Sequence, residues 1–272
     1  PPPPPPAPPP PLFFFLQTSA FEIPLRLVGS EMCIRDRFYI GLLNSQPMGF
    51  YSPSQLIQDA RRHHIMVLPV DVNHSSWDHQ ILSSADQQQP PIRLGLRLIK
   101  GLSEAAGQRI HTAQRQRTFA NVADLRQRAC LDRGDMEALA AADALSGISG
   151  NRYQSHWQTM ALEAHRPLLP YDSAAQRSQD DAAVTTAPTL PEDVVADYQS
   201  TGLTLRSHPL TLLRHQPPFD RCRRQTELET LGNHRFVRVA GLVTCRQRPG
   251  TASGVVFLTL EDETGNINVI VW

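Results

Sequence analysis

The sequence predicts an α+β, multidomain protein, and three observations support this fold class. Helix-capping residues and apolar residues at helical spacing recur between residues 38 and 165 and again between 193 and 235. Apolar and polar residues alternate in 236–272, as they do in β-strands. A segment rich in Pro, Ala, Asp and Thr, residues 166–192, divides the chain and is typical of a linker.

Residues 1–37 differ in character from the rest of the chain. Residues 1–12 are proline apart from Ala7 and Leu12, and Leu27–Arg37 resembles an in-frame translation of a sequencing-library adapter. We therefore interpret residues 1–37 as a non-native, adapter-derived tail. The alternative is a native proline-rich tail that stays extended.

Charge is distributed unevenly although the formal net charge is zero. Residues 93–128 carry eight basic side chains against two acidic ones, and residues 206–248 carry nine against three, so each segment has an excess of +6. Such basic modules favour polyanionic partners such as nucleic acid, although scattered surface arginines would give the same count.

Several classes of function are disfavoured by composition. The sequence contains no apolar run approaching the roughly 18–20 residues of a membrane span. Cys130, Cys222 and Cys245 are isolated from one another and from ligand-spaced histidines, which predicts reduced thiols in the cytoplasm and no zinc site. His63 and His64 are adjacent on an expected helix and diverge by about 100°, so they are unsuited to one metal ion.

The first expected helix begins at a capping box, Ser52-Pro53-Ser54-Gln55, with proline at the first helical position. Its buried face is expected to carry Leu56, Ile57, Ala60 and His64. Residues Ile65–Val72 then predict a short buried strand that Pro69 interrupts, and residues 83–91 predict a polar linker.

Residues 92–165 predict a helix-hairpin-helix domain. Apolar residues between Leu94 and Ile99 lead into a tight turn, Lys100–Ser103, and a second helix is expected from Glu104 to about Gln114. In this motif the turn and the following helix N-terminus present backbone N–H groups to a DNA phosphate. Ser103 stands where the motif usually has glycine and is expected to cap the second helix; an ordinary helical hairpin is the alternative. The residues expected to face the core are Ala105, Ala106, Ile110, Val122, Leu125, Met136, Leu139, Ala140 and Leu145.

Residues 236–272 predict three strands of an OB-fold β-barrel, truncated after the third. The expected strands are Val237–Val243, Val255–Leu260 and Ile267–Val271, with a turn at Asp262–Gly265. OB-folds bind nucleic acid on the face of their second and third strands. Because three strands leave an open apolar edge, we expect the natural protein to continue past Trp272.

Several segments, taken in order, resemble the C-family DNA polymerases of bacteria, that is, the polymerase III alpha-subunit type. Two further segments favour the error-prone, damage-inducible branch of that family over the main replicase. The stretches that carry the family resemblance are Phe38–Tyr51, Pro69–Asn73, Trp77-Asp78, Arg93–Arg97 and Ile99–Gly101, and those that favour the error-prone branch are Asp197–Leu210 and Arg246–Gly265.

The resemblance implies that residues 38–82 are the end of a fingers domain of a template-directed DNA polymerase. In the family, palm-domain aspartates upstream of the fingers hold magnesium for two-metal chemistry. Asp71, Asp78 and Asp86 are spread over a strand end and a linker, so no catalytic residue and no metal ligand is assigned in this chain. Magnesium is expected for the parent polymerase only, and the fragment alone is expected to be inactive.

Nine residues are predicted to contact DNA. The hairpin contributes Lys100, Gly101 and Ser103, with Arg97 and Arg109 alongside, unless these two arginines lie on a solvated helix face. The sheet contributes cationic and stacking candidates, although the aromatic one could instead belong to the core. These are Arg238, Arg246, Arg248 and Phe257.

Two kinds of function remain open at this stage. One is the DNA-holding part of an error-prone polymerase in translesion synthesis and DNA repair; the other is a free-standing, non-enzymatic DNA-binding accessory protein. The fingers-like segment 38–82 favours the first, because a binding module needs no such segment. His165–Tyr171 lacks the glutamine and phenylalanine of a sliding-clamp peptide, so clamp contact is expected through an inactive polymerase-like partner.

Overall fold

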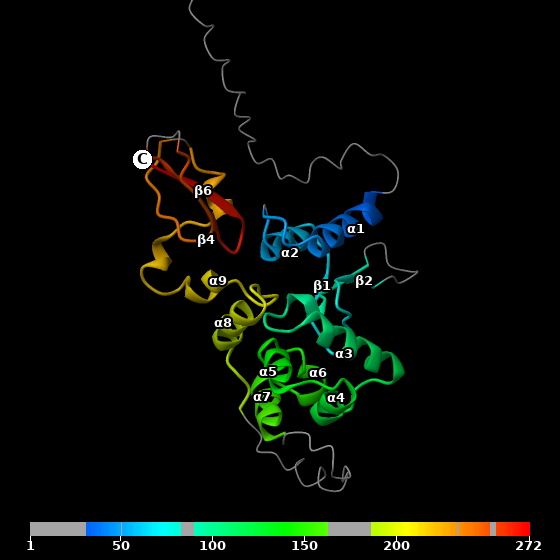
Figure 1. Ribbon diagram of the computed structural model, residues 1–272. Helices are drawn as coiled ribbons and strands as arrows, with labels where there is room; N and C mark the ends of the chain where they lie inside the picture. Colours follow the sequence, from blue (N-terminus) through cyan, green and yellow to red (C-terminus); the bar gives the residue numbers. More distant parts are fainter. Residues whose placement is uncertain (1–30, 50, 83–89, 163–185, 233, 251–253) are drawn as a thin grey trace, which may run out of the picture.

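The computed structural model describes residues 31–49, 51–82, 90–162, 186–232, 234–250 and 254–272. The helical module formed by residues 94–162 lies at one end of the molecule, and α2 and the C-terminal sheet lie toward the other (Figure 1). Most of the expected tail and linkers, and His165–Tyr171, fall outside the described residues. The described part contains no helix long and apolar enough to cross a membrane.

Two helices begin the described chain, α1 (Glu31–Asn44) and α2 (Pro53–Arg62). The expected tail boundary at residue 37 therefore lies within α1. The capping box of α2 is confirmed, because the Ser52 hydroxyl accepts a hydrogen bond from Gln55 N and Ser52 N donates one to Gln55 Oε1 at 3.0 Å. The placement of His64 on the buried face was wrong: α2 ends at Arg62, and His64 is exposed with φ of 62°.

A small three-stranded sheet joins these helices to the helical module. Strand β3 (Ile92–Arg93) lies between β1 (Val67–Leu68), parallel to it, and β2 (Gln80–Ile81), antiparallel to it. The strand expected at Ile65–Val72 is thus only two residues long, and Pro69, which has no N–H to donate, follows it directly. Ile92 packs with Tyr39, Ala60 and Ile65, so the expected domain boundary at residue 92 lies inside a shared core.

The helical module contains α3 (Glu104–Gln116), α4 (Val122–Arg128), α5 (Arg133–Ala141), α6 (Ser146–Ser149) and α7 (Arg152–Ala161). Where the first hairpin helix was expected, the chain forms a single 3-10 turn, η2 (Leu96–Leu98). The expected core residues are buried with one exception, Ala105, which is exposed. Gly107 lies inward instead, against Trp77, where an added Cβ would come within 2.3 Å of the indole ring.

A connecting segment returns the chain toward α2. It contains α8 (Leu190–Ser200), α9 (Pro209–Leu213), η3 (Phe219–Arg221) and α10 (Gln225–Leu228). The expected linker end at residue 192 was wrong, because a capping box at Thr189 and Glu192 starts α8 at Leu190. Helices α8 and α9 lie between the helical module and the C-terminal sheet (Figure 1).

The chain ends in an antiparallel sheet of three strands in the order β4 (Leu242–Gln247), β5 (Val256–Glu261) and β6 (Asn266–Val271). The first strand begins later than the expected Val237–Val243, and Val239 forms only an isolated bridge with Arg223. The turn at Asp262–Gly265 is confirmed by the hydrogen bond from Asp262 N to Gly265 O at 2.9 Å. The described strands do not close on themselves, so a barrel is not confirmed.

Candidate nucleic-acid interface

The hairpin turn has the backbone geometry that its sequence predicts. Gly101 has φ of 87°, in the left-handed region that favours glycine. The Ser103 hydroxyl accepts a hydrogen bond from Ala106 N at 3.2 Å, which confirms Ser103 as the N-cap of α3. The side chain of Ser103 is therefore used within the protein, and the N-terminal end of α3 faces the turn as the motif requires.

Lys100 joins the hairpin to helix α8. Its Nζ donates hydrogen bonds to Tyr198 O and Gln199 O, both at 3.0 Å, and its backbone N donates to Ser200 O at 2.9 Å. These carbonyls end α8, where the helix dipole favours a positive charge. A phosphate contact by Lys100 would have to compete with these bonds.

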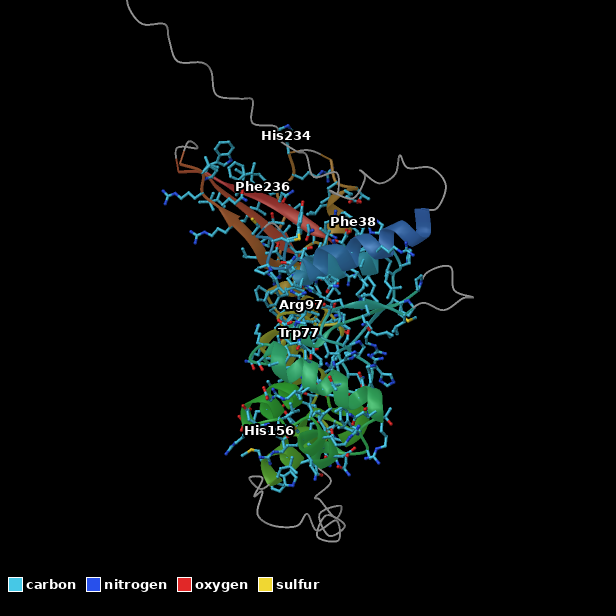
Figure 2. The ribbon with its side chains drawn as sticks, turned by 45° about the vertical axis from the view of Figure 1, so that its right-hand side comes forward. Phe38, Trp77, Arg97, His156, His234 and Phe236 are labelled. Carbon is cyan, nitrogen blue, oxygen red and sulfur yellow. The ribbon has the colours of Figure 1, made fainter. Side chains whose placement is uncertain are left out.

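Arg97 and Arg109 are also held by the protein itself. Arg97 donates to Asn44 O and Asp78 Oδ1, both at 2.8 Å, and lies between the N-terminal helices and the helical module (Figure 2). Arg109 donates to Ala129 O at 3.0 Å and pairs with Asp135 at 3.3 Å. Both arginines therefore connect elements of the fold. They are not free to bind a phosphate, as one prediction required, and they are not simply solvated, as the alternative required.

The arginines of the sheet are different. Arg238, Arg246 and Arg248 are exposed, and their side chains make no hydrogen bond or ion pair within the described part of the chain. Phe257 is half-buried. Arg246 pairs in register with Leu258, whereas Phe257 pairs with Gln247, so Arg246 and Phe257 lie on opposite faces of the sheet. They cannot serve one nucleotide together on a single face.

Sequence reasoning missed a network that holds α8 in place. The buried guanidinium of Arg152 contacts Asp193 at 2.7 Å and also binds Asp197. Arg206 binds Asp197 at 2.8 Å and Asp143 at 2.8 Å. Only the acidic and basic residues themselves were visible in the sequence, because the pairs that Arg152 forms and the pair Arg206–Asp143 join positions more than 40 residues apart.

The carboxylates that were considered as metal ligands do not converge. Asp71 accepts hydrogen bonds from Asn73 N at 2.7 Å within its own turn, and Asp78 pairs with Arg97. Asp86 lies outside the described residues. Within the described ranges no group of three or more His, Cys, Asp or Glu side chains is placed to hold an ion. These residues do not fit the magnesium site of a polymerase.

The chain matches known proteins in two comparisons. A family model described as a helix-hairpin-helix motif matches residues 64–155. Proteins named error-prone DNA polymerase match 86% of the chain, at 53% identity in Saccharophagus degradans, 54% in Teredinibacter turnerae and 47% in Methylococcus capsulatus. The chain spans only 22–24% of the length of these relatives.

Proposed function

We propose that this chain, which is homologous to the error-prone DNA polymerases, is the DNA-holding C-terminal part of such an enzyme. The observation that carries the proposal is its identity of about 50% to polymerases of that name over 86% of the chain. The names of these relatives also agree with the assignment of the sequence to the error-prone branch of the family. The parent protein would act in damage-induced translesion synthesis and DNA repair.

Two structural features support a role in holding DNA. The helix-hairpin-helix match includes the Gly101 turn and α3, whose N-terminus is suited to a phosphate. The exposed Arg246 and Arg248 at one end of the C-terminal sheet can contact a nucleic-acid backbone. Because Lys100, Arg97 and Arg109 are engaged within the protein, the sheet arginines are the stronger candidates.

The chain alone is proposed to lack polymerase activity. Two-metal phosphoryl transfer needs converging carboxylates, and those of the described residues lie apart or are paired. The parent enzyme would take magnesium on residues outside this chain. It would work in the bacterial cytoplasm, and an inactive polymerase-like partner would provide its contact with the sliding clamp.

Binding and extension assays test this proposal together. Fluorescence anisotropy with a primer–template and with a single-stranded oligonucleotide should show binding that weakens linearly in log affinity with log salt concentration. A primer-extension assay with magnesium and all four deoxynucleotides should show no extension by the chain alone. Failure to bind either DNA, or extension of the primer, would contradict the proposal.

The genomic locus provides an independent test. A long read across codon 38 should show an open frame that continues upstream into a palm domain with converging aspartates. A start codon near Phe38 would instead support the free-standing accessory protein.

A further inference from the structure

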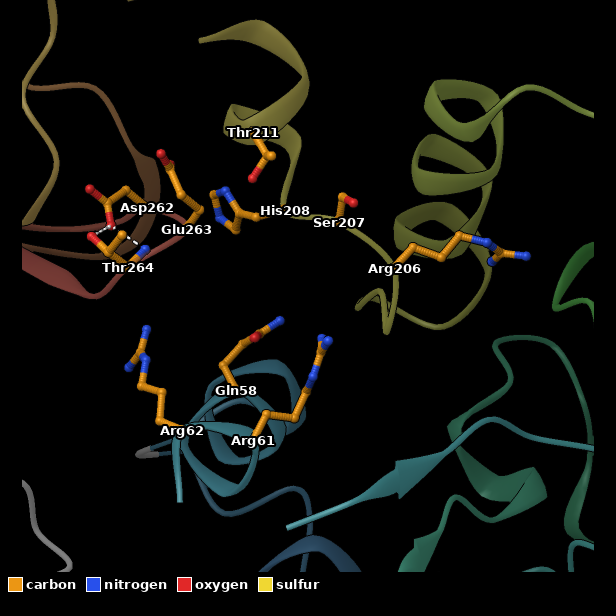
Figure 3. A pocket seen from close by; sticks show the side chains of 10 residues that line it. All are labelled: Gln58, Arg61, Arg62, Arg206, Ser207, His208, Thr211, Asp262, Glu263 and Thr264. Atoms are coloured by element: carbon orange, nitrogen blue, oxygen red, sulfur yellow. Dashed lines mark hydrogen bonds between the residues drawn. The ribbon is translucent and has the colours of Figure 1, made fainter. Parts of the chain in front are cut away.

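A cleft lies between helix α2, the segment Arg206–Thr211 and the turn that joins β5 to β6. Its volume is about 350 Å³. The side chains of Gln58, Arg61 and Arg62 extend from α2 toward the loop that carries His208, whereas Arg206 points away toward α8 (Figure 3). Helix α2 is thus about 150 to 200 residues away in the sequence from the other two segments that form the cleft.

His208, one of the residues that line the cleft, is buried. The His208 side chain is 8% exposed, and its Nδ1 accepts a hydrogen bond from Leu210 N at 3.2 Å. In the neutral ring Nε2 therefore carries the proton, and Nε2 has no hydrogen-bond partner within the described residues. This nitrogen is enclosed by the protein, 4.0 Å from Glu261 Oε1, so it is not exposed to a ligand in the cleft.

The other groups that face the cleft are mainly donors as well. Arg61 and Arg62 are exposed and have no hydrogen bond or ion pair from their side chains within the described ranges. The Ser207 and Thr211 hydroxyls are likewise without a partner there. Two guanidinium groups with nearby hydroxyls are suited to a phosphate, which offers several acceptor oxygens and negative charge.

The acidic residues around the cleft are already compensated. Asp262 accepts hydrogen bonds from backbone N–H groups of its own turn and from Gln225 N at 2.8 Å. Glu263 pairs with Arg214 at 2.8 Å and with Arg224 at 3.0 Å. Glu261 is buried with its Oε1 4.0 Å from His208 Nε2; burial raises the pKa of its carboxyl, and nearby Arg62 acts in the opposite direction. Among the described residues that line the cleft, Arg61 and Arg62 are the cations whose side chains form no ion pair.

We propose that this cleft binds a backbone phosphate of a DNA strand through Arg61 and Arg62, with the Ser207 and Thr211 hydroxyls as further donors. The inference rests on the proposed function and extends it, because it adds a contact that links the fingers-like helix to the C-terminal sheet. A strand held there would contact α2 and the β5–β6 turn at once. None of the nine residues predicted from the sequence belongs to this site.

The test compares two charge-matched double variants of the whole chain. Arg61→Gln/Arg62→Gln should lower the salt slope, the slope of log affinity against log salt concentration, for single-stranded DNA by roughly 0.7, the value for one phosphate contact. Arg115→Gln/Arg133→Gln removes the same charge from exposed positions on the helical module and should leave the slope nearly unchanged. Thr211→Val, which deletes one hydroxyl from the cleft, should weaken binding about two- to fivefold, and thermal unfolding verifies that each variant is folded.

The outcomes separate this inference from the function on which it rests. Wild-type binding together with an unchanged slope in the Arg61/Arg62 variant would overturn the cleft site and leave the proposed function standing. No binding of DNA by the wild type would overturn both. Titration with deoxythymidine triphosphate identifies the source of the phosphate. If the free nucleotide binds saturably and the Arg61/Arg62 variant binds the oligonucleotide as the wild type does, the assignment to a DNA strand is overturned.

Discussion

Residues 93–128 of the helical module and residues 206–248, which lead into the C-terminal sheet, have the same excess of positive charge in the sequence but use it differently. In the module, Arg97, Lys100 and Arg109 all donate hydrogen bonds to the protein itself. In the sheet, Arg246 and Arg248 are exposed and make no such bonds within the described part of the chain. A basic cluster in a sequence therefore indicates either a connection between elements or a binding surface, and only the contacts distinguish the two.

The two regions also differ in burial. The core of the module includes Ile110, Leu125 and Leu139, each 0% exposed, whereas Ile267 is the single buried hydrophobic residue described in the three sheet strands, at 8%. Val243, Ile270 and Trp272 of the sheet region are 59%, 49% and 92% exposed. The module is thus stabilised by its own packing, and the sheet leaves much of its apolar surface uncovered.

The ion network beside the module gives the largest expected effect. Asp193→Ala/Asp197→Ala removes both carboxylates that pair with Arg152, whose side chain is 6% exposed, and leaves Arg206 paired with Asp143. Leaving a buried charge unpaired should cost about 3–5 kcal/mol in the free energy of unfolding, measured in urea. The exposed pair Arg133–Glu137 is the control, because Arg133→Ala should cost less than about 1 kcal/mol. Equal costs would contradict a structural role for the network.

A core truncation should distinguish the two regions next. Leu139→Ala creates a cavity in the module and should lower the free energy of unfolding by about 2–5 kcal/mol. Ile270→Ala, at a half-exposed sheet position, should cost about 1 kcal/mol or less. Urea midpoints of the two variants provide the measurement. A larger loss for Ile270→Ala would show that the sheet is better packed than its exposure indicates.

The pH dependence of stability should reveal the buried His79, which accepts a hydrogen bond from Gly95 N at 3.0 Å. Burial lowers the pKa of His79 to about 4, below its usual value of 6.5. Between pH 6.5 and 4 the unfolded chain binds the proton more readily, so stability falls as the pH falls through that range, by about 3 kcal/mol in total, and this contribution is fully present above pH 6.5.

This dependence should be weaker in His79→Gln and unchanged in His156→Gln, since His156 is exposed. Urea unfolding at several pH values between 4 and 7 measures it. Carboxylates that titrate in the same range affect both variants equally, so subtracting one variant's free energy of unfolding from the other's at each pH removes their contribution. Identical pH profiles would show that His79 is not the group responsible.

The salt dependence of DNA binding gives the smallest effect and tests the charge comparison directly. Arg248→Ala should lower the salt slope by roughly one unit, as expected from the sequence. Arg97→Ala was expected to do the same, but its bonds to Asn44 O and Asp78 now predict an unchanged slope and a loss of stability. A lower slope in Arg97→Ala would restore Arg97 as a phosphate contact.

The sequence by itself determined the local features of this protein. The capping box at Ser52, the cap at Ser103, the glycine turn at Gly101 and the Asp262–Gly265 turn follow from interactions between neighbouring residues, and all are present. The apolar spacing likewise identified core residues such as Met136 and Leu145. The resemblance to the error-prone polymerases also depended on residue order alone, and the similar proteins confirm it.

The tertiary structure decided what the charged side chains do. Lys100 could be recognised as basic and near a turn, but its bonds to Tyr198 O and Gln199 O depend on a helix about 100 residues away. The cleft with Arg61, Arg62 and His208 depends on still longer separations. Local patterns specify backbone conformation because their partners are close in the chain, whereas a long charged side chain takes whichever partner the packing brings within reach.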